Sequence, residues 1–277
     1  MKRILTAFIT LVLLPPLFGA GPEAPAAGPA PAPGGKPSAT ACVYQYKGAV
    51  YLLEPGYEFW NTIERAVPLK EGARIKTGPG AWCQILAGDG TFINLDENSE
   101  TLIETLRLEK ESVCGEGASK DCVPKPAKRD YGFNFIKGRI LWMAAKVKHK
   151  LSRFEIRTPS AVCAVRGTDF SINVTSSTAD IGLFEGQLDI RSGGKETVLS
   201  AGTEAVAAPG SDVQVSARLS RLMEAEKRRY LKLQKHVEDL RLKLEAREDF
   251  IDDFVQAQQK KLKDFEDRKR EKLEKRK

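Results

Sequence analysis

The chain has 277 residues, of which 42% are hydrophobic and 29% charged, and its formal net charge is +7. Residues 218–277 hold 20 Lys and Arg against 14 Asp and Glu, so this segment alone carries +6. The rest of the chain is close to neutral, which disfavours a nucleic-acid-binding domain, because such domains concentrate basic residues on one surface.

Residues 1–20 have the layout of a secretory signal peptide. A basic pair at positions 2–3 precedes an apolar run over 4–14, and two prolines follow. A membrane-spanning helix needs about 20 apolar residues, so this run is too short, and proline breaks it. We therefore expect an exported protein of the periplasm or cell envelope. An uncleaved signal that anchors the chain is the alternative, because the residues before Ala20 do not form a clean cleavage site.

Residues 21–41 are mostly Ala, Pro and Gly. This composition prevents both helix formation and strand pairing, so we expect a stiff, extended linker. Recognition of the prolines by a partner is the less favoured alternative.

Short apolar alternations divided by glycine-containing turns fill residues 42–210. This pattern is typical of an all-β sandwich or a β-solenoid. Segments 75–85 and 156–165 both run Ile, basic residue, Thr, small residues and Cys, which suggests a duplicated unit and favours stacked strands. The predicted fold class is mainly β: a duplicated solenoid-like or sandwich domain followed by a long C-terminal helix or coiled coil.

The cysteines suggest disulfides, since exported proteins usually pair them. Cys114 and Cys122 flank a polar, glycine-containing excursion, so we expect them to form a bridge. A metal site is the rival, but there is no Cys-x-x-Cys and no nearby histidine. Cys83 and Cys163 occupy matching places in the two similar segments. They form a second disulfide if the segments stack as neighbours, and otherwise they are two buried thiols; both interpretations stay open.

The segment 158–174 predicts a strand, a tight corner and a second strand. Apolar residues alternate on both sides of Arg166-Gly167, where glycine permits backbone angles that other residues avoid. Thr-Pro, an apolar run, Val-Arg-Gly-Thr and an aromatic residue together resemble the FecR domain, an extracytoplasmic module. The motif residues, with a structural or a partner-binding role, are Thr158, Pro159, Arg166, Gly167, Thr168 and Phe170.

Similar stretches at 69–95, 138–141 and 183–202 extend the resemblance over roughly residues 46–208. It implies a solenoid-like β fold and a family of regulators that pass a signal from an outer-membrane receptor to a sigma factor through a cytoplasmic helical domain. Only three residues precede the apolar run here, so we expect that a signalling part requires a separate partner chain.

Arg166 has two interpretations. It binds a carboxylate of a partner, or it holds the corner together by donating to carbonyls or to an acid such as Glu185 or Asp169. The second interpretation is favoured, because arginines at strand corners are more often structural.

The β domain offers no set of catalytic groups. Its single histidine, His149, stands in the basic run 146–150, which is most simply a solvated strand face or hairpin tip. A patch for an anionic glycan or lipid headgroup is the alternative. We predict no catalytic residue, no metal, no cofactor and no enzymatic activity.

Residues 216–277 contain neither proline nor glycine and repeat apolar residues at heptad spacing, which predicts one long charged helix. Glu226, Arg247 and Lys261 interrupt the seam. The helix therefore either forms a coiled coil that makes a homo-oligomer, or packs its apolar stripe back on the β domain. The predicted seam residues are Leu233, Val237, Leu240, Leu244, Ile251 and Phe254.

These features predict an exported, non-enzymatic envelope protein. Its FecR-like module, with the helical tail, binds or scaffolds an envelope protein or polymer. A periplasmic sensor subunit that acts through a separate partner is the alternative, and an envelope-polymer hydrolase is a remote one.

Overall fold

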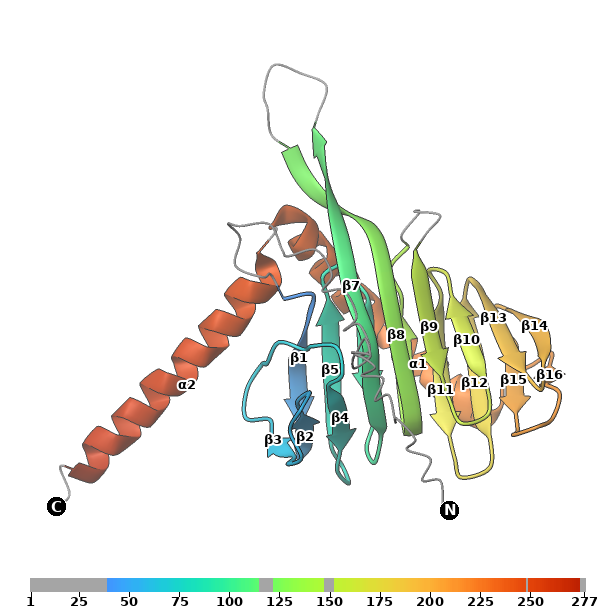
Figure 1. The fold of residues 1–277 in the computed structure, drawn as a ribbon, viewed down its shortest axis with the longest axis horizontal. Coiled ribbons are helices and arrows are strands. Elements are labelled where there is room, and N and C mark those ends of the chain that lie inside the picture. Colours follow the sequence, from blue (N-terminus) through green and yellow to red (C-terminus); the bar gives the residue numbers. More distant parts are fainter. Residues whose placement is uncertain (1–38, 115–121, 147–151, 248, 275–277) are drawn as a thin grey trace, which may run out of the picture. The chain divides into compact units, whose positions relative to one another are not determined.

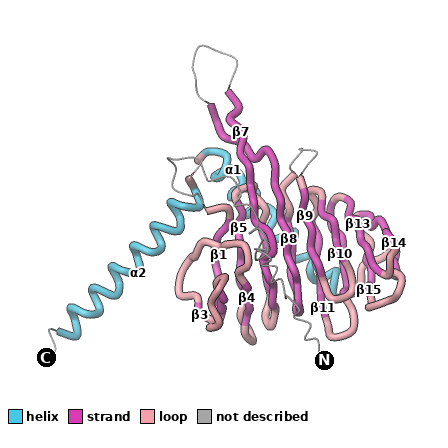
Figure 2. The backbone as a smooth tube through the Cα atoms, in the orientation of Figure 1, coloured by secondary structure: helices cyan, strands magenta, loops and turns pink. Residues whose placement is uncertain are grey.

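The computed structural model describes residues 39–114, 122–146, 152–247 and 249–274. The predicted signal peptide, most of the predicted linker and His149 lie outside these residues. The described residues form sixteen strands and two helices, which confirms the predicted mainly β class (Figures 1 and 2).

The elements in chain order are β1 (Ala41–Lys47), β2 (Val50–Leu53), β3 (Asn61–Thr62), β4 (Arg74–Thr77), β5 (Trp82–Ala87), β6 (Phe92–Leu95), β7 (Glu100–Cys114), β8 (Cys122–Met143), β9 (Arg153–Arg157), β10 (Val162–Val165), β11 (Asp169–Val174), β12 (Ala179–Glu185), β13 (Gln187–Ser192), β14 (Lys195–Ser200), β15 (Glu204–Ala207), β16 (Gln214–Ser216), α1 (Arg221–Ala246) and α2 (Phe250–Glu274).

The strands pair in one sheet with two halves, and β8 belongs to both. Residues 122–137 of β8 pair with β7 and, in part, with β9, whereas residues 138–143 pair with β6 and β11. The strand changes halves at Gly138, whose φ of 94° favours glycine. A Cβ there would collide with the backbone of Ser99. We call β1, β5, β6, β11, β12, β15 and β16 the helix-covered half, and β2, β3, β4, β7, β9, β10, β13 and β14 the open half.

The two halves face one another across the main hydrophobic core. Trp142, on the part of β8 that belongs to the helix-covered half, is fully buried. Its ring centroid lies 4.9 Å from that of Phe133 and 5.4 Å from that of Phe154, both on the open half. The chain therefore folds one sheet back on itself and buries the apolar side chains between the layers.

The outer faces of the two halves differ. In β9 and β10 of the open half, buried residues alternate with more exposed ones, as expected where one face meets solvent. In the helix-covered half, all four residues of β6 are buried, and so are five of the six in β5. A second apolar cluster covers this outer face, and it joins Leu86, Phe92, Leu141 and Met143 of the sheet to Tyr230, Val237 and Leu240 of α1.

The structure divides the predicted long helix in two. α1 begins after Ser220, whose Oγ accepts the N–H of Met223 at 3.3 Å, and it ends at Arg247, whose backbone is extended. α2 starts again at Phe250. Phe250 and Ile251 are both buried in the second cluster, so tertiary packing, and not helix propensity, sets the break.

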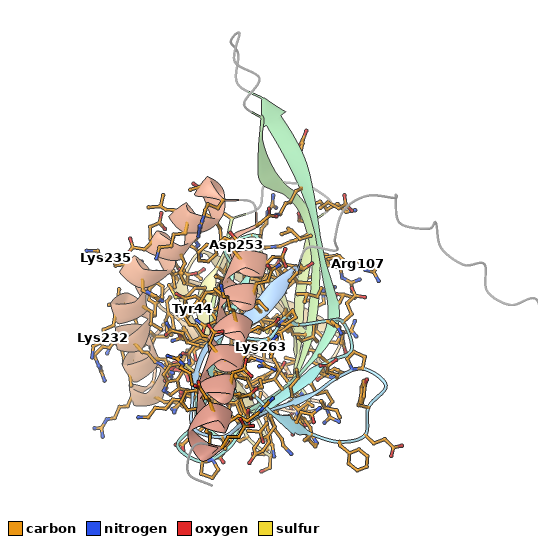
Figure 3. The ribbon with its side chains drawn as sticks, turned by 90° about the vertical axis from the view of Figure 1, so that its left-hand side faces the viewer. Tyr44, Arg107, Lys232, Lys235, Asp253 and Lys263 are labelled. Atoms are coloured by element: carbon orange, nitrogen blue, oxygen red, sulfur yellow. The ribbon has the colours of Figure 1, made fainter. Side chains whose placement is uncertain are left out.

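The predicted coiled-coil seam residues of α1 pack against the sheet of the same chain. Val237 and Leu240 are fully buried in the second cluster, and Leu233 and Leu244 pack against it half-exposed. The structure thus takes the packed-back alternative for α1, and these buried residues are not available for contact between chains. On the other side of α1, the exposed side chains of Lys232 and Lys235 point away from the sheet (Figure 3).

Cys83 and Cys163 are buried free thiols, so the structure takes that alternative over the second disulfide. Cys83 lies on β5 of the helix-covered half and Cys163 on β10 of the open half, so the similar segments are not neighbouring strands. Burial raises the pKa of each thiol to about 12. Cys114 and Cys122 lie directly opposite one another in the β7–β8 ladder. Opposite residues are about 4.5–5.5 Å apart between Cα atoms, a spacing that disulfides span, and this bridge stays a prediction.

Candidate functional site

Thr158 and Pro159 form the turn that leads into β10. Thr158 Oγ1 accepts a hydrogen bond from the N–H of Ala161 at 2.9 Å and lies 3.0 Å from the carbonyl oxygen of the same residue. Proline suits the position after Thr158 because its ring fixes φ as a turn requires. These two motif residues therefore shape the backbone.

The corner itself is held from inside the domain. Gly167 is buried with φ 64°, and the side chain of Lys146 lies against it. The carbonyl of Thr168 accepts a hydrogen bond from Ala144 N at 3.1 Å. Phe170 is fully buried and stacks on Trp142, with ring centroids 6.3 Å apart. The corner is thus part of the main core and rigid.

Arg166 and Pro159 are the exposed residues of this motif, and Arg166 is the charged one. None of the hydrogen bonds and ion pairs between described side chains involves it, so the favoured interpretation as internal support is not what the structure has. The carboxylate of Glu185 is already taken, by Lys146 Nζ at 3.0 Å and by Tyr230 Oη at 3.0 Å. The guanidinium of Arg166 is therefore presented to solvent on a fixed corner.

Behind the corner, Asp169 and Glu185 meet α1. Tyr230 Oη donates to the carboxylate of Glu185 at 3.0 Å, and Gln234 Nε2 donates to Tyr230 Oη at 2.7 Å. Burial raises the pKa of Asp169 to about 6, although the neighbouring Tyr230 and the charge of Arg241 oppose the rise. Burial also raises the pKa of Tyr230. This helix-contact cluster joins the sequence motif to the helix.

A second charged cluster holds α1 on the sheet. Asp96 accepts from Arg139 of β8 at 2.7 Å and is paired with Arg229 of α1 at 2.7 Å. Both arginines also lie near Glu226 of α1, at 3.4 and 3.6 Å. Burial raises the pKa of Glu226, and Arg229 and Arg139 act against that rise. The seam interruption at Glu226 is therefore an ion-paired contact with the sheet.

The sequence of residues 73–189 matches the family described as FecR protein. These residues form a FecR domain. The match contains Asp96, Arg139, Asp169 and Glu185, the sheet residues of both charged clusters, whereas their partners on α1 lie beyond it. In this chain the sheet of the FecR domain is therefore covered by α1, which lies outside the matched residues.

Two crystal structures of a candidate anti-sigma factor from Parabacteroides distasonis ATCC 8503 are similar to the chain. Their TM-scores are both 0.39, with 13% and 12% sequence identity. Each comparison covers 52% of this chain, and the chain spans 59% of the length of that protein. The search among curated proteins gives no match.

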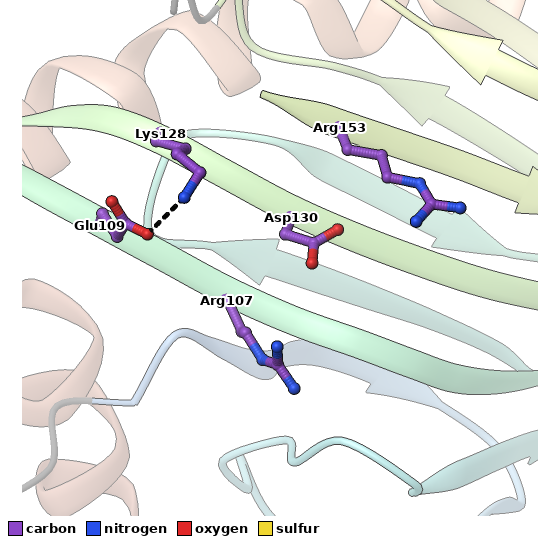
Figure 4. Close-up of a pocket in the computed structure, with 5 residues that line it drawn as sticks. All are labelled: Arg107, Glu109, Lys128, Asp130 and Arg153. Carbon is purple, nitrogen blue, oxygen red and sulfur yellow. Dashed lines mark hydrogen bonds and ion pairs between the residues drawn. The ribbon is translucent and has the colours of Figure 1, made fainter. Parts of the chain in front are cut away.

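The outer face of the FecR domain's open half has a charged hollow of about 220 Å³ (Figure 4). It is lined by Arg107, Glu109, Lys128, Asp130 and Arg153. Each of its cations is paired: Arg107 with Glu71 at 2.9 Å, Lys128 with Glu109 at 2.7 Å, and Arg153 with Glu155 at 2.7 Å. The hollow therefore offers no unpaired cation to an anionic ligand, and Arg166 is the better candidate.

Two further observations concern only the described residues. No group of three or more His, Cys, Asp or Glu side chains is placed there to hold a metal ion. Neither helix combines the length and the apolar character that crossing a membrane requires.

Sequence reasoning missed the helix-contact cluster. Asp169 stands inside the motif but was considered only as a partner for Arg166. The available signal was the nearly unbroken apolar run of β12, Ile181 to Phe184, which indicates a strand that is buried on both faces. Such a strand needs a covering element, and α1 is that element.

Proposed function

We propose that this chain is an exported, non-enzymatic envelope protein whose FecR domain binds a carboxylate-bearing partner protein at Arg166. The observation that supports this most is an exposed guanidinium that pairs with none of the described residues, on a corner that Gly167, Thr168 and Phe170 fix from inside. The FecR domain at residues 73–189 supports a role in signalling through partner proteins. The predicted export signal supports the location.

Arginine suits this role because its planar guanidinium matches a carboxylate with two parallel hydrogen bonds. A rigid corner also reduces the conformational entropy that is lost on binding. A hydrogen bond to a charged group contributes about 1.5–3 kcal/mol, so Arg166 can account for a measurable part of an interface but not for all of it.

A periplasmic sensor subunit is the second candidate function, and the helix-contact cluster favours it. Asp169, with a pKa raised to about 6, lies between the FecR domain and α1. A change in its charge near neutral pH would alter how firmly the helix covers the domain. In this function, too, the chain acts through a separate partner protein.

Photo-crosslinking in cells tests the binding proposal. A photo-reactive residue replaces Lys146, whose side chain lies against Gly167, in backgrounds with Arg166, Arg166→Lys or Arg166→Ala. The matched control carries the same residue at Val198, which is 53% exposed on β14. We expect one protein to be captured at position 146 and not at 198, with capture lost in Arg166→Ala and partly kept in Arg166→Lys. Equal capture with Arg166→Ala would show that the arginine does not bind the partner.

A further inference from the structure

The first turns of α2 are docked on the sheet. Ile251 and Val255 are 4% and 5% exposed in the second cluster. The ring of Phe254 lies 4.8 Å from that of Tyr44 on β1, and Asp252 Oδ1 accepts from Ala39 N at 3.0 Å. This end of the helix therefore has an apolar face that the FecR domain's neighbouring strand covers.

The same face continues along α2 without a cover. Eleven residues make about three helical turns, so Leu262 follows Ile251 and Phe265 follows Phe254 on one side of the helix. Phe265 is 60% exposed, and Leu262 is half-exposed. The docked interface is thus extended by an apolar stripe that no described residue covers.

The charges nearest to Phe265 on this helix have one sign. At about 100° per residue, Lys261, Arg268 and Lys269 lie within about 60° of Phe265. The acids of the same turns, Asp264, Glu266 and Asp267, lie about 100° or more away. Among described side chains, Lys261 and Lys269 have no ion-pair partner, and both are exposed. Arg268 donates from Nε only to the backbone oxygen of Asp264, at 2.9 Å. The side of the helix around Phe265 is therefore apolar and basic, and Glu266, about 40° from Leu262, is the acid nearest to the stripe.

Charge decides what fits this face. A second copy of the helix would bring two basic stripes together, and like charges repel. An anionic lipid bilayer complements the stripe, because apolar side chains enter the interface while flanking lysines and arginines keep their charges at the headgroups. The sequence adds Lys-Arg-Lys at 275–277. We propose that the exposed part of α2, residues 258–274, binds the surface of an anionic phospholipid membrane through Leu262, Phe265 and the basic residues beside them.

This inference goes beyond the Arg166 site and does not depend on it. Each basic residue near an anionic membrane surface strengthens binding by about fivefold. Neutralising three of them should thus weaken binding about 100-fold. Charges on the opposite side of the helix lie about 10 Å further from the lipid, close to one Debye length, and contribute much less.

The test measures co-sedimentation of the full chain with vesicles of phosphatidylglycerol and phosphatidylcholine in equal parts, and with phosphatidylcholine alone. The stripe variant combines Lys261→Gln, Arg268→Gln and Lys269→Gln. The matched control combines Lys260→Gln, Lys263→Gln and Arg270→Gln, which removes the same charge from the other side. Phe265→Ser tests the apolar contribution, and circular dichroism confirms that each variant keeps its helix content.

We expect salt-sensitive binding to the anionic vesicles, about 100-fold weaker for the stripe variant and only about sixfold weaker for the control. If both variants lost vesicle binding equally, the binding would depend only on the total charge of the helix, which would overturn the proposal. Binding that is equal on both kinds of vesicle, with no change in any variant, would overturn it as well. A dimer that Phe265→Ser dissociates would assign the stripe to a second copy.

Discussion

Replacing Leu240 by alanine probes the contact between α1 and the FecR domain. Leu240 is fully buried in the second apolar cluster, beside the equally buried Val237. A buried Leu→Ala change destabilises by about 2–5 kcal/mol, because apolar contacts are lost and a cavity is left. Leu231→Ala is the matched control: it changes the same helix in the same way, but Leu231 is 53% exposed, and the expected loss is below about 0.5 kcal/mol.

Urea unfolding of both variants measures the difference. With a slope of about 2 kcal/mol per M, Leu240→Ala should move the midpoint down by about 1–2.5 M and Leu231→Ala by less than about 0.3 M. The shift should be the same at two protein concentrations tenfold apart, since the contact lies within one chain. Equal shifts for the two variants, or a shift that grows on dilution, would refute the packing described here and favour a coiled coil between chains.

Four further outcomes follow from the structure. Since the pKa of Asp169 is raised to about 6, the folded chain keeps a proton on Asp169 between about pH 4 and 6 that the unfolded chain has lost, so the contribution of Asp169 to stability falls as the pH rises through that window. The control is Asp169→Asn, whose side chain cannot titrate and faces the same Tyr230, Glu185, Lys146 and Arg241. Relative to this variant, the wild type should lose about 2 kcal/mol of unfolding free energy from pH 4 to 6, measured in urea, and a difference that stays constant with pH would contradict this. Gly138→Ala should lower the melting temperature more than Gly194→Ala, because both have positive φ but only Gly138 also meets the backbone of Ser99; equal losses would argue against the close approach. Thiol titration of the unfolded, unreduced exported chain should find three thiols, those of Cys42, Cys83 and Cys163, and a count of five would exclude the Cys114–Cys122 bridge. Arg166→Ala should change stability by less than about 0.5 kcal/mol in thermal unfolding, and a larger loss would indicate an internal role.

The strand, corner and second strand of the motif could be predicted because they depend on the backbone preferences and side-chain alternation of neighbouring residues. Gly167 was expected to take backbone angles closed to other residues, and its φ of 64° confirms this. The apolar alternation of Phe170, Ile172 and Val174 in β11 predicted a buried face, and all three are buried. In β10 the same prediction was wrong, because Cys163 and Val165 are buried and Val162 and Ala164 are half-exposed. Local patterns identify the inner face of a strand because side chains alternate with a period of two.

The position of α1 could not be predicted in the same way. The seam at Val237 and Leu240 fits a partner helix and a sheet equally well, since both bury an apolar stripe. The strand that α1 covers distinguishes the two cases, because all four residues of Phe92–Leu95 are buried on both faces of the sheet. This was hard to predict because the polar Asn94 interrupts the apolar run of that strand. The break between α1 and α2 carries neither glycine nor proline, so only the burial of Phe250 and Ile251 accounts for it.

Partners that lie far apart in the sequence were the least predictable. Cys83 and Cys163 share a local pattern, yet the strands that carry them belong to different halves of the sheet. Arg166 was predicted to pair with Glu185 or Asp169, but Lys146 and Tyr230 already bind Glu185, and Asp169 is buried. The sequence shows which residues could pair, but contacts between residues far apart in the sequence depend on the tertiary fold.

An engineered disulfide between α1 and the FecR domain tests the central claim most directly. A Cβ at Gly182 of β12 would lie 3.0 Å from the Cβ of Met223, and an outward shift of α1 by about 0.5–1 Å would reach the 3.5–4.5 Å that disulfides span. Gly182 has no positive φ that would disfavour a side chain. Gly182→Cys combined with Met223→Cys should oxidise to a bridge within one chain, which mass spectrometry of mixed light and heavy isotope-labelled protein identifies. Bridges between light and heavy chains, or no bridge at all, would contradict a helix that covers its own domain.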